Sequence, residues 1–458
     1  MPLPRFVLTL TLASAVFGTA VVATQNPPPS QPPPQQQQSE VGLTISSDNP
    51  GAPPKYAVPD FIALSNDAET LAAAKTLGQV LWDDLQFERE FNMIPRDTYA
   101  SIPAARAIDA IAFDRWKELG ADGVVSGTVQ RDGTGLKIQV KLFGVRAQQA
   151  AFSREYSGSA ANPRAYAHAI ADEIHKRQRG LDGVARSKLT FSSDRDREKI
   201  TGTVENRDVK EVYIADYDGE NQRRITVNRV LNITPTWSPD GRAIAYTSYA
   251  RGFPTIFVSL IYEGRRLEPS TPGTQNWLPV WSPDGSKIAF TSNRDGNSEL
   301  YVMNKDGSNV RRLTNNPAID TTPTWSPTGG QLAFTSDRSG GPAIYVVGAD
   351  GLNPRRISTE GYCDRATWSP APFNELAYVC RNGPGYDIKV YDFATGQVRQ
   401  ITNGEGSNES PAFAPNGRHL AFTSTRAGRV QIFIIGRDGK DVRQITRLGN
   451  NYTPNWSR

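Results

Sequence analysis

The chain has 458 residues, which is more than one ordinary domain and predicts at least two. Lys and Arg total 51 against 47 Asp and Glu, and a net charge of +4 over this length gives no electrostatic reason to expect nucleic acid or an anionic membrane as a partner. Three His and two Cys exclude a Cys/His zinc cluster and an iron–sulfur site, whereas 39 Gly and 33 Pro are typical of short strands joined by tight turns.

The N-terminal 40 residues have the composition of an export signal followed by a spacer. The apolar run from Phe6 to Val22 follows Arg5 and ends in small residues, which predicts a signal peptide over residues 1–23 with cleavage near Ala23. The alternative is an uncleaved anchor. Residues 24–40 contain six Pro and six Gln, so we expect a disordered spacer. The mature protein is expected to be soluble and exported, without inserting into a membrane.

Residues 41–185 are predicted to form a small α/β domain. Period-two alternation indicates strands at 41–45, 124–129 and 136–143, with a short strand at 91–94. Helices are predicted from about 66 to 85, 108 to 119 and 162 to 178. The first helix is expected to begin with a capping box at Asn66–Glu69 and to bury Leu71, Ala74, Leu77, Leu81 and Leu85.

Residues 186–458 contain an internal repeat of about 44 residues. Its anchor is Pro-x-Trp-Ser-Pro-Asp-Gly, and the aromatic residue of that anchor recurs at Trp237, Trp281, Trp325, Trp368, Phe413 and Trp456. A glycine turn before an Arg-rich strand recurs at the same spacing. Four strands in this period are typical of a β-propeller blade, so the sequence predicts an all-β, six-bladed propeller of WD-like repeats.

The two ends of the repeat array are complementary. The first copy begins at Ser187–Phe191 without an anchor, and the last anchor, at Trp456, is followed only by Ser457 and Arg458. An open ring would leave unpaired strand edges. We therefore expect the C-terminal segment to supply the inner strand of the first blade.

The chain lacks the sequence signatures of the catalytic and metal sites that this architecture suggests. A propeller peptidase needs a Gly-x-Ser-x-Gly nucleophile elbow, which does not occur in the chain. His168 and His175 are spaced to share a helix face but have no third zinc ligand, and His419 is expected to be structural. The repeated Asp-Gly pairs are interpreted as hairpin turns rather than calcium loops, and the Trp anchors as packing between blades. We therefore expect no propeller-peptidase activity, no metal and no cofactor.

The only two cysteines fall in one predicted blade. If the hairpin turns between Ala371 and Pro372, Cys363 and Cys380 lie opposite each other. In an oxidising compartment these positions favour a cross-strand disulfide. Two free thiols in the core are the alternative.

Several segments together resemble the TolB family of the Tol–Pal system over nearly the whole mature chain. In the first domain the resemblance rests on three segments, and in the propeller on a fourth segment and on the repeats: Phe91–Arg96, Trp116–Gly127, Ile174–Arg186 and Val212–Gly219. The resemblance implies a non-enzymatic, monomeric scaffold that helps maintain the outer membrane and draws it inward at cell division. The Pro/Gln spacer departs from the usual family pattern.

The resemblance also implies two protein partners. The lipoprotein Pal is expected to meet loops that enter the inner strands, which here correspond to Gln275, Trp277, Leu278, Asp320, Thr321 and Thr322. The inner-membrane protein TolA is expected to take up the mature N-terminal segment, which here contains Val41, Gly42, Leu43, Thr44 and Ile45. Two alternatives remain, namely another exported propeller that binds a sugar or peptide, and a non-catalytic relative of propeller peptidases.

Overall fold

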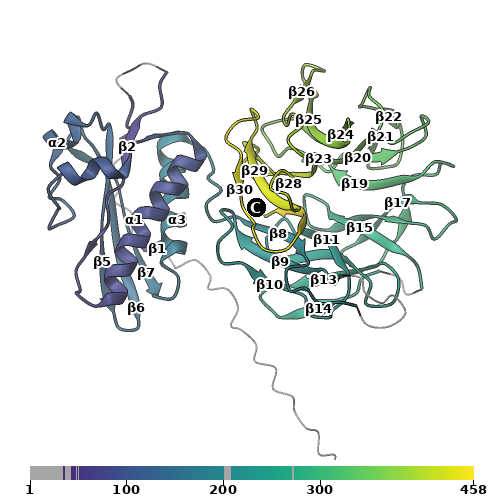
Figure 1. Ribbon diagram of the computed structural model, residues 1–458, viewed down its shortest axis with the longest axis horizontal. Coiled ribbons are helices and arrows are strands. Elements are labelled where there is room, and N and C mark those ends of the chain that lie inside the picture. The colour runs from purple at the N-terminus through teal and green to yellow at the C-terminus, as the bar shows by residue number, and fades with distance from the viewer. Residues whose placement is uncertain are drawn as a thin grey trace, which may run out of the picture.

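The computed structural model describes residues 35–36, 43–47, 49, 51–200, 208–270 and 273–457. A small α/β domain lies beside a larger β-propeller (Figure 1). The expected signal peptide, most of the expected spacer, and Val41 and Gly42 lie outside the described residues. In the described part of the chain, no helix has both the length and the apolar character needed to cross a membrane.

The N-terminal domain is a mixed sheet in the order β1-β7-β6-β5-β2-β4, with β3 paired to β5. Its strands are β1 (Gln35–Gln36), β2 (Lys55–Ala57), β3 (Ile62–Ala63), β4 (Asn92–Met93), β5 (Gly123–Asp132), β6 (Gly135–Gly144) and β7 (Gln149–Ser159). Its helices are α1 (Ala68–Glu88), the 3-10 helix η1 (Arg96–Ser101), α2 (Phe113–Glu118) and α3 (Pro163–Arg179).

The core of this domain lies between the sheet and the helices α1 and α3. The strand predicted over 136–143 is confirmed as β6, and its alternate side chains Leu136, Ile138, Val140 and Leu142 are all inaccessible to solvent. On α1, Leu77, Leu81 and Leu85 pack in the same cluster. Burying apolar area of this extent is the main favourable contribution to folding a domain of this size.

Several predicted details of this domain are wrong. Helix α1 is capped by Asp67, whose carboxylate accepts from the Thr70 amide, so Asn66 and Glu69 form no capping box. Leu71 is half-exposed, because the buried face of α1 is centred on Leu77 and Leu81. Helix α2 begins at Phe113 rather than 108. Strand β7 was not predicted, since its sequence contains no β-branched residue to reveal an alternation.

The propeller consists of six four-stranded antiparallel sheets, as predicted. Blade one is β31 (Asn451–Trp456), β8 (Lys188–Ser193), β9 (Glu211–Asp216) and β10 (Arg223–Arg224). Blade two is β11 (Asn232–Trp237), β12 (Ala243–Ser248), β13 (Thr255–Leu260) and β14 (Arg265–Leu267). Blade three is β15 (Asn276–Trp281), β16 (Lys287–Ser292), β17 (Glu299–Asn304) and β18 (Arg311–Arg312).

The remaining three blades follow the same order from the inner to the outer strand. Blade four is β19 (Asp320–Trp325), β20 (Gln331–Ser336), β21 (Ala343–Gly348) and β22 (Arg355–Arg356). Blade five is β23 (Cys363–Trp368), β24 (Glu375–Asn382), β25 (Gly385–Asp392) and β26 (Val398–Gln400). Blade six is β27 (Asn408–Phe413), β28 (His419–Ser424), β29 (Gln431–Gly436) and β30 (Arg443–Gln444).

The ring closes through the C-terminal strand. β31 pairs antiparallel with β8, and Trp456 lies opposite Leu189. The indole Nε1 of Trp456 donates to the Ser187 hydroxyl oxygen at 2.6 Å. The first blade is therefore built from both ends of the repeat array, as the missing first anchor predicted.

Candidate functional site

The two faces of the propeller differ in what they contact. On one face, turns of blades one and six meet the N-terminal domain. Glu88 on α1 pairs with Arg418 at 2.9 Å, and Arg89 pairs with Asp438 at 2.8 Å. We call the opposite face, formed by the beginnings of the inner strands and the connections between second and third strands, the open face.

A buried polar cluster fixes the N-terminal domain to the propeller. His168 Nδ1 lies 2.8 Å from Asp84, and the Tyr217 hydroxyl donates to the same carboxylate at 2.7 Å. Burial lowers the pKa of His168, but the carboxylates of Asp84 and Asp216 outweigh it and raise this pKa to about 9. The positive charge of His168 therefore links both domains.

The other titratable groups at this contact have structural roles. Burial raises the pKa of Glu88 to about 7, although Arg418 and the Val184 amide oppose the rise. His419 stacks on Phe87 with ring centroids 4.3 Å apart, and burial lowers its pKa to about 3. The Nδ1 atom of His175 lies 3.0 Å from the backbone oxygen of Ala171, so it does not share a ligand with His168.

The open face surrounds the mouth of the central channel, and each inner strand has a β-bulge there. In each blade the pairing between inner and second strand shifts, for example between Trp277 and Val280. The residue within each bulge is not glycine, yet its φ is positive, between 49° and 56°. These six residues, which we call the mouth ring, are Thr234, Leu278, Thr322, Arg365, Ser410 and Thr453.

The local sequence accounts for the bulges. In five of the six blades a proline follows the mouth-ring residue, and in blade five its place is taken by Ala366. Proline has no amide hydrogen to donate, so the ladder is interrupted at this point. A left-handed backbone at a residue other than glycine is uncommon, and its repetition in every blade shows that the fold imposes it.

The mouth ring has the chemistry of a binding surface. Its members are four hydroxyl side chains, one leucine and one arginine. The Thr322 hydroxyl donates to Thr335 at 2.7 Å, and Arg365 lies 3.8 Å from Asp364. All three His residues of the chain lie in or against the N-terminal domain, so no His is available here to activate a hydroxyl as a nucleophile.

Exposed apolar side chains lie on the loops that lead from one blade to the next. Among the described residues, four of the six loops expose such a side chain: Val227, Ile319, Tyr362 and Leu448. Val227 and Leu448 are the most open, with exposed fractions of 74% and 68%. Exposed apolar residues next to hydroxyl groups are typical of surfaces that bind proteins.

The predicted Pal-contact residues are only partly suited to that role. The expected entering loops are in fact the first residues of β15 and β19, because the inner strands begin at Asn276 and Asp320. Asp320 is fully buried and pairs with Arg338 at 2.7 Å, so it faces away from any partner. Gln275 is exposed, whereas Trp277 and Thr321 are half-buried. Leu278 and Thr322 belong to the mouth ring.

The equivalent residues of the other four blades were missed from the sequence. Each directly precedes the repeated proline, or Ala366 in its place, and stands three residues before the aromatic anchor. That constant position is a sequence signal that would have identified them. The anchors themselves pack between blades, as expected; Trp281, for example, lies in one hydrophobic cluster with Ile256 and Val258 of blade two.

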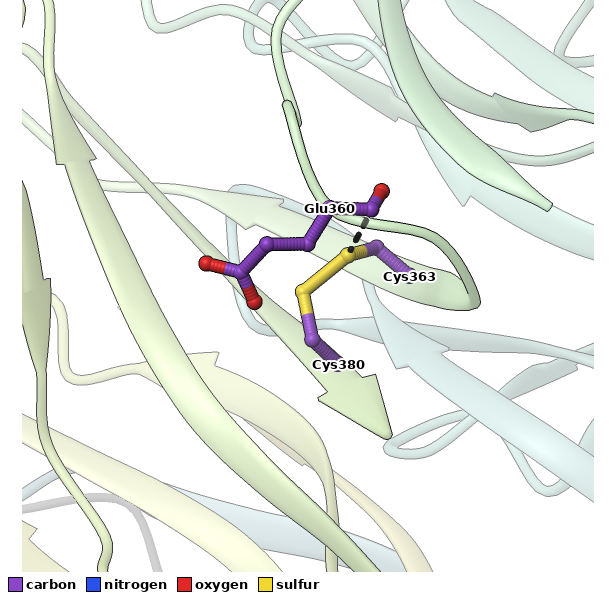
Figure 2. Close-up of side chains that lie close together, drawn as sticks. All are labelled: Glu360, Cys363 and Cys380. Carbon is purple, nitrogen blue, oxygen red and sulfur yellow. Dashed lines mark hydrogen bonds between the residues drawn. A yellow bond between two sulfur atoms is a disulfide. The ribbon is translucent and has the colours of Figure 1, made fainter. Parts of the chain in front are cut away.

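The two cysteines lie at the edge of the open face in blade five. They are register partners on β23 and β24, and a disulfide joins Cys363 to Cys380 (Figure 2). Glu360 lies beside them, and its backbone oxygen is 3.7 Å from Cys363 Sγ. These three residues form a group with the spacing of metal ligands. Because both sulfurs are bonded to each other, they offer no thiolate to an ion.

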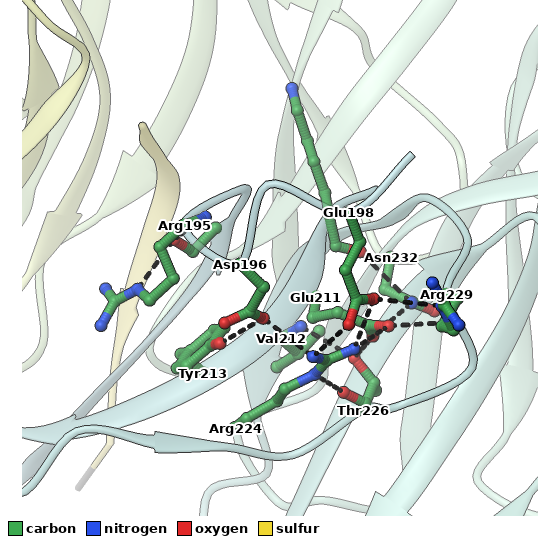
Figure 3. A network of polar contacts seen from close by, with 12 residues as sticks. Arg195, Asp196, Glu198, Glu211, Val212, Tyr213, Arg224, Thr226, Arg229 and Asn232 are labelled. Atoms are coloured by element: carbon green, nitrogen blue, oxygen red, sulfur yellow. Dashed lines mark hydrogen bonds and ion pairs between the residues drawn. The ribbon is translucent and has the colours of Figure 1, made fainter. Parts of the chain in front are cut away.

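The described part of the connection between β8 and β9 contacts blade one through Asp196 and Glu198 (Figure 3). Arg224 on β10 donates to Asp196 at 2.9 Å and to Glu211 at 2.8 Å, and it also pairs with Glu198. The Glu211 carboxylate accepts from the Asn232 amide group at 2.8 Å. These carboxylates are neutralised by arginine, which favours a structural role over ion binding.

The predicted TolA segment is partly described. Residues 43–47 form no strand, because the backbone of this segment is hydrogen-bonded to the side chain of Gln178 rather than to a neighbouring strand. Gln178 at the end of α3 accepts from the Ile45 amide at 2.9 Å and donates to the Leu43 carbonyl at 3.1 Å. Ile45 is buried and Thr44 is exposed. The prediction of a strand over 41–45 is therefore wrong for its described part.

Together, the fold and the open face define a two-domain β-propeller protein with a candidate surface for binding another protein. A family profile described as the TolB beta propeller domain matches residues 187–372 and 366–458, and one described as the TolB amino-terminal domain matches residues 43–151. The chain belongs to the TolB family.

Relatives and a solved structure agree with this assignment. The chain is 32% identical over 211 residues to the Tol-Pal system protein TolB of Desulfosudis oleivorans, over 46% of each chain. It is 33% identical over 200 residues to that of Hahella chejuensis, over 43% of this chain and 44% of the relative. These matches span a little under half the length of the curated relatives. The crystal structure of TolB from Acinetobacter baumannii superposes with a TM-score of 0.74 at 26% identity, over 89% of this chain and 97% of that one.

Proposed function

We propose that the chain is a non-enzymatic periplasmic adaptor of the Tol–Pal system, which links a TolA-like inner-membrane protein to a Pal-like lipoprotein. The observation that supports this proposal most is that the two faces of the propeller differ in what they contact. One face is occupied by the N-terminal domain, through contacts such as Glu88–Arg418, and the other presents the mouth ring. The disulfide Cys363–Cys380 is in keeping with an oxidising compartment.

The mouth ring is proposed as the centre of the Pal-binding surface. Leu278 and Thr322 lie on neighbouring blades, and exposed Ile319 lies just before β19. An interface of this kind needs a central apolar contact with polar groups around it, which these side chains supply. The backbone is fixed by the bulges before a partner arrives, so little conformational entropy is lost on binding.

The segment that includes Val41–Ile45 is proposed to bind TolA by strand addition, which uses backbone groups and tolerates sequence change. Releasing it would break two hydrogen bonds to Gln178, at roughly 1 kcal/mol each, and expose Ile45, at about 1.5–3 kcal/mol. A strand added to a sheet can recover a cost of this size, because each added residue pair contributes further backbone hydrogen bonds.

The proposal is tested by calorimetry with the purified mature chain and each partner from the same bacterium. We expect one molecule of chain to bind Pal and TolA at separate sites, and a chain lacking residues 24–46 to keep Pal binding but lose TolA binding. Failure of the intact chain to bind Pal would refute the adaptor function. Unchanged TolA affinity after the deletion would refute the N-terminal assignment alone.

A further inference from the structure

The junction between blades six and one holds an aromatic ring of the N-terminal domain. Phe87 of α1 stacks on His419 with ring centroids 4.3 Å apart, and it meets Tyr217 edge-on at 4.8 Å. His419 is the first residue of β28, and Tyr217 directly follows β9 of the next blade. We call these two positions of the repeat the ring-contact positions, and each junction between blades has its own pair.

At the junction between blades three and four, the ring-contact positions are Lys287 and Ala349, and both line a cleft of about 720 Å³. Lys287 is the first residue of β16, and Ala349 directly follows β21. The remaining four blades have larger residues after the third strand, namely Ile261, Lys305, Phe393 and Arg437. The small side chain of Ala349 therefore leaves space here. Figure 1 shows β17 and β19, which flank this junction, on the side of the propeller away from the N-terminal domain.

The apolar lining of the cleft suits an aromatic side chain. It comes from two strands and two turns, and consists of Pro283, Val302, Met303, Trp325 and Pro327. An aromatic ring packs favourably against a methionine sulfur and against another aromatic ring. An aromatic residue also buries a large apolar area while only two of its side-chain torsions are fixed.

One polar group in the lining has no partner. Trp325 is 8% exposed, and its indole Nε1 has no hydrogen-bond acceptor among the described residues. In blade one the corresponding Trp456 donates to Ser187, which directly precedes β8. In blade four Gly330 holds that position and has no side chain to accept. A ligand oxygen at this point would remove the cost of a buried, unpaired donor.

The cleft also has a positive charge at its edge. Lys287 is exposed, and no carboxylate in the described part of the chain pairs with it. The Asp284 carboxylate, also in the lining, accepts from the hydroxyl groups of Ser282 and Ser286 in its own turn. Arg311 is engaged as well, because it donates to two backbone oxygens of blade four. Lys287 is therefore the charge that a ligand meets, and it favours a carboxylate.

The contact between Phe87 and the propeller combines the same two features. The residue next to Phe87 in the chain is Glu88, and its carboxylate pairs with Arg418 at 2.9 Å. The propeller thus already binds an aromatic ring with an adjacent carboxylate, on the same face and at the corresponding positions of the repeat.

We propose that the cleft between blades three and four binds a segment of another protein that presents an aromatic side chain beside a carboxylate. The ring packs against Met303 and Trp325, and the carboxylate pairs with Lys287. The cleft lies on the face opposite the mouth ring, so this inference stands whether or not the open face binds Pal.

The test is disulfide tethering of short peptides to the full exported chain. Thr328→Cys places a thiol at the exposed edge of the cleft, and native Cys363 and Cys380 are bonded to each other. The probes are the acetylated and amidated peptides Cys-Gly-Phe-Glu, Cys-Gly-Ala-Glu and Cys-Gly-Phe-Gln, offered under thiol–disulfide exchange. Mass spectrometry of the intact chain measures the labelling, with the unaltered chain as the blank.

We expect the Phe-Glu peptide to label about tenfold more than the Ala-Glu peptide, because a buried phenyl ring contributes most of the affinity. It should label about twofold more than the Phe-Gln peptide, as an exposed ion pair contributes less. Equal labelling by the three peptides would overturn the proposal.

A second variant tests where the ring binds. Ala349→Tyr is added to the Thr328→Cys chain, since Tyr217 shows that the fold accommodates tyrosine at this position. Ile261→Tyr makes the same change at the junction of blades one and two and is the matched control. The preference for the Phe-Glu peptide should be lost in the first variant and kept in the second.

A preference that survives Ala349→Tyr would overturn the placement in the cleft. A dimer of the unaltered chain in sedimentation that Ala349→Tyr dissociates would assign the cleft to a second copy, and would overturn the proposal too. Neither readout involves Pal or TolA, so the outcome is separate from that of the adaptor function.

Discussion

Truncating Trp456 tests whether the C-terminal strand holds the propeller closed. Trp456 is 7% exposed, pairs with Leu189 across the junction of β31 and β8, and donates its indole hydrogen to Ser187. In Trp456→Ala, the junction loses both the packing of the indole and this hydrogen bond. In blade one, unlike the other five, the inner strand β31 and the second strand β8 come from opposite ends of the repeat array, so no connecting turn holds these two strands together.

The size of the effect follows from these contacts. Replacing a buried aromatic residue with alanine costs about 3–5 kcal/mol, and a lost hydrogen bond adds roughly 1 kcal/mol. For a domain of this size, the corresponding fall in Tm is on the order of 10 °C. Trp456→Phe should cost much less, because blade six itself has Phe413 at the anchor position.

Thermal and urea unfolding measure the effect. Trp325→Ala is the matched control, since this anchor is equally buried but its indole nitrogen has no hydrogen-bond acceptor among the described residues. We expect Trp456→Ala to be at least as destabilising as Trp325→Ala, and a chain lacking residues 451–458 to lose cooperative unfolding. A truncated chain with the Tm of the intact chain would refute the closure.

Three further predictions concern the disulfide, the domain contact and the N-terminal segment. The unfolded, unreduced protein should show no titratable thiol, and breaking the Cys363–Cys380 link, which spans 17 residues, should cost about 3 kcal/mol; two thiols before reduction would contradict the pairing. The pKa of His168 is about 9 in the folded protein and about 6.5 in the unfolded chain. Its contribution to the free energy of unfolding is therefore complete below pH 6.5 and is lost as the pH rises through 9. The free energy of unfolding measured in urea should therefore fall by at most about 3–4 kcal/mol over that pH range, and this fall should be absent in His168→Gln. The same dependence of the unfolding free energy on pH in both proteins would refute the linkage. Gln178→Ala should release residues 43–45 and raise TolA affinity several-fold. A lower affinity would show that TolA binds this segment while it is hydrogen-bonded to Gln178.

The repeat architecture was predictable because each blade repeats the same local signals. Trp, Asp-Gly turns and alternating strands recur every 44 residues or so, and the missing first anchor indicated closure. In the N-terminal domain, the strand over 41–45 was predicted from alternation alone. Its described part is held by Gln178, which is 133 residues from Ile45, and no local pattern reveals a partner at that separation.

The candidate site was less predictable for a physical reason. Loops and strands were assigned from local patterns, but pairing with the second strand continues on the N-terminal side of each bulge, so the inner strands begin at Asn276 and Asp320. Asp320, a polar residue expected at the surface, is buried because Arg338 neutralises it. The mouth ring exists only when six copies meet around one axis, so it is a property of the closed fold.

The central claim is that Pal binds the open face around the mouth ring. The most direct test is the Pal affinity of Leu278→Arg with Thr322→Arg, because Arg365 has the same backbone conformation and shows that the ring accommodates arginine. The matched control is Leu352→Arg with Val398→Arg, which changes two exposed apolar residues on the opposite face. We predict that the mouth-ring variant loses more than tenfold in affinity, or about 1.4 kcal/mol, with little change in Tm, while the control binds as wild type does. Wild-type affinity in the mouth-ring variant, or an equal loss in the control, would contradict the account.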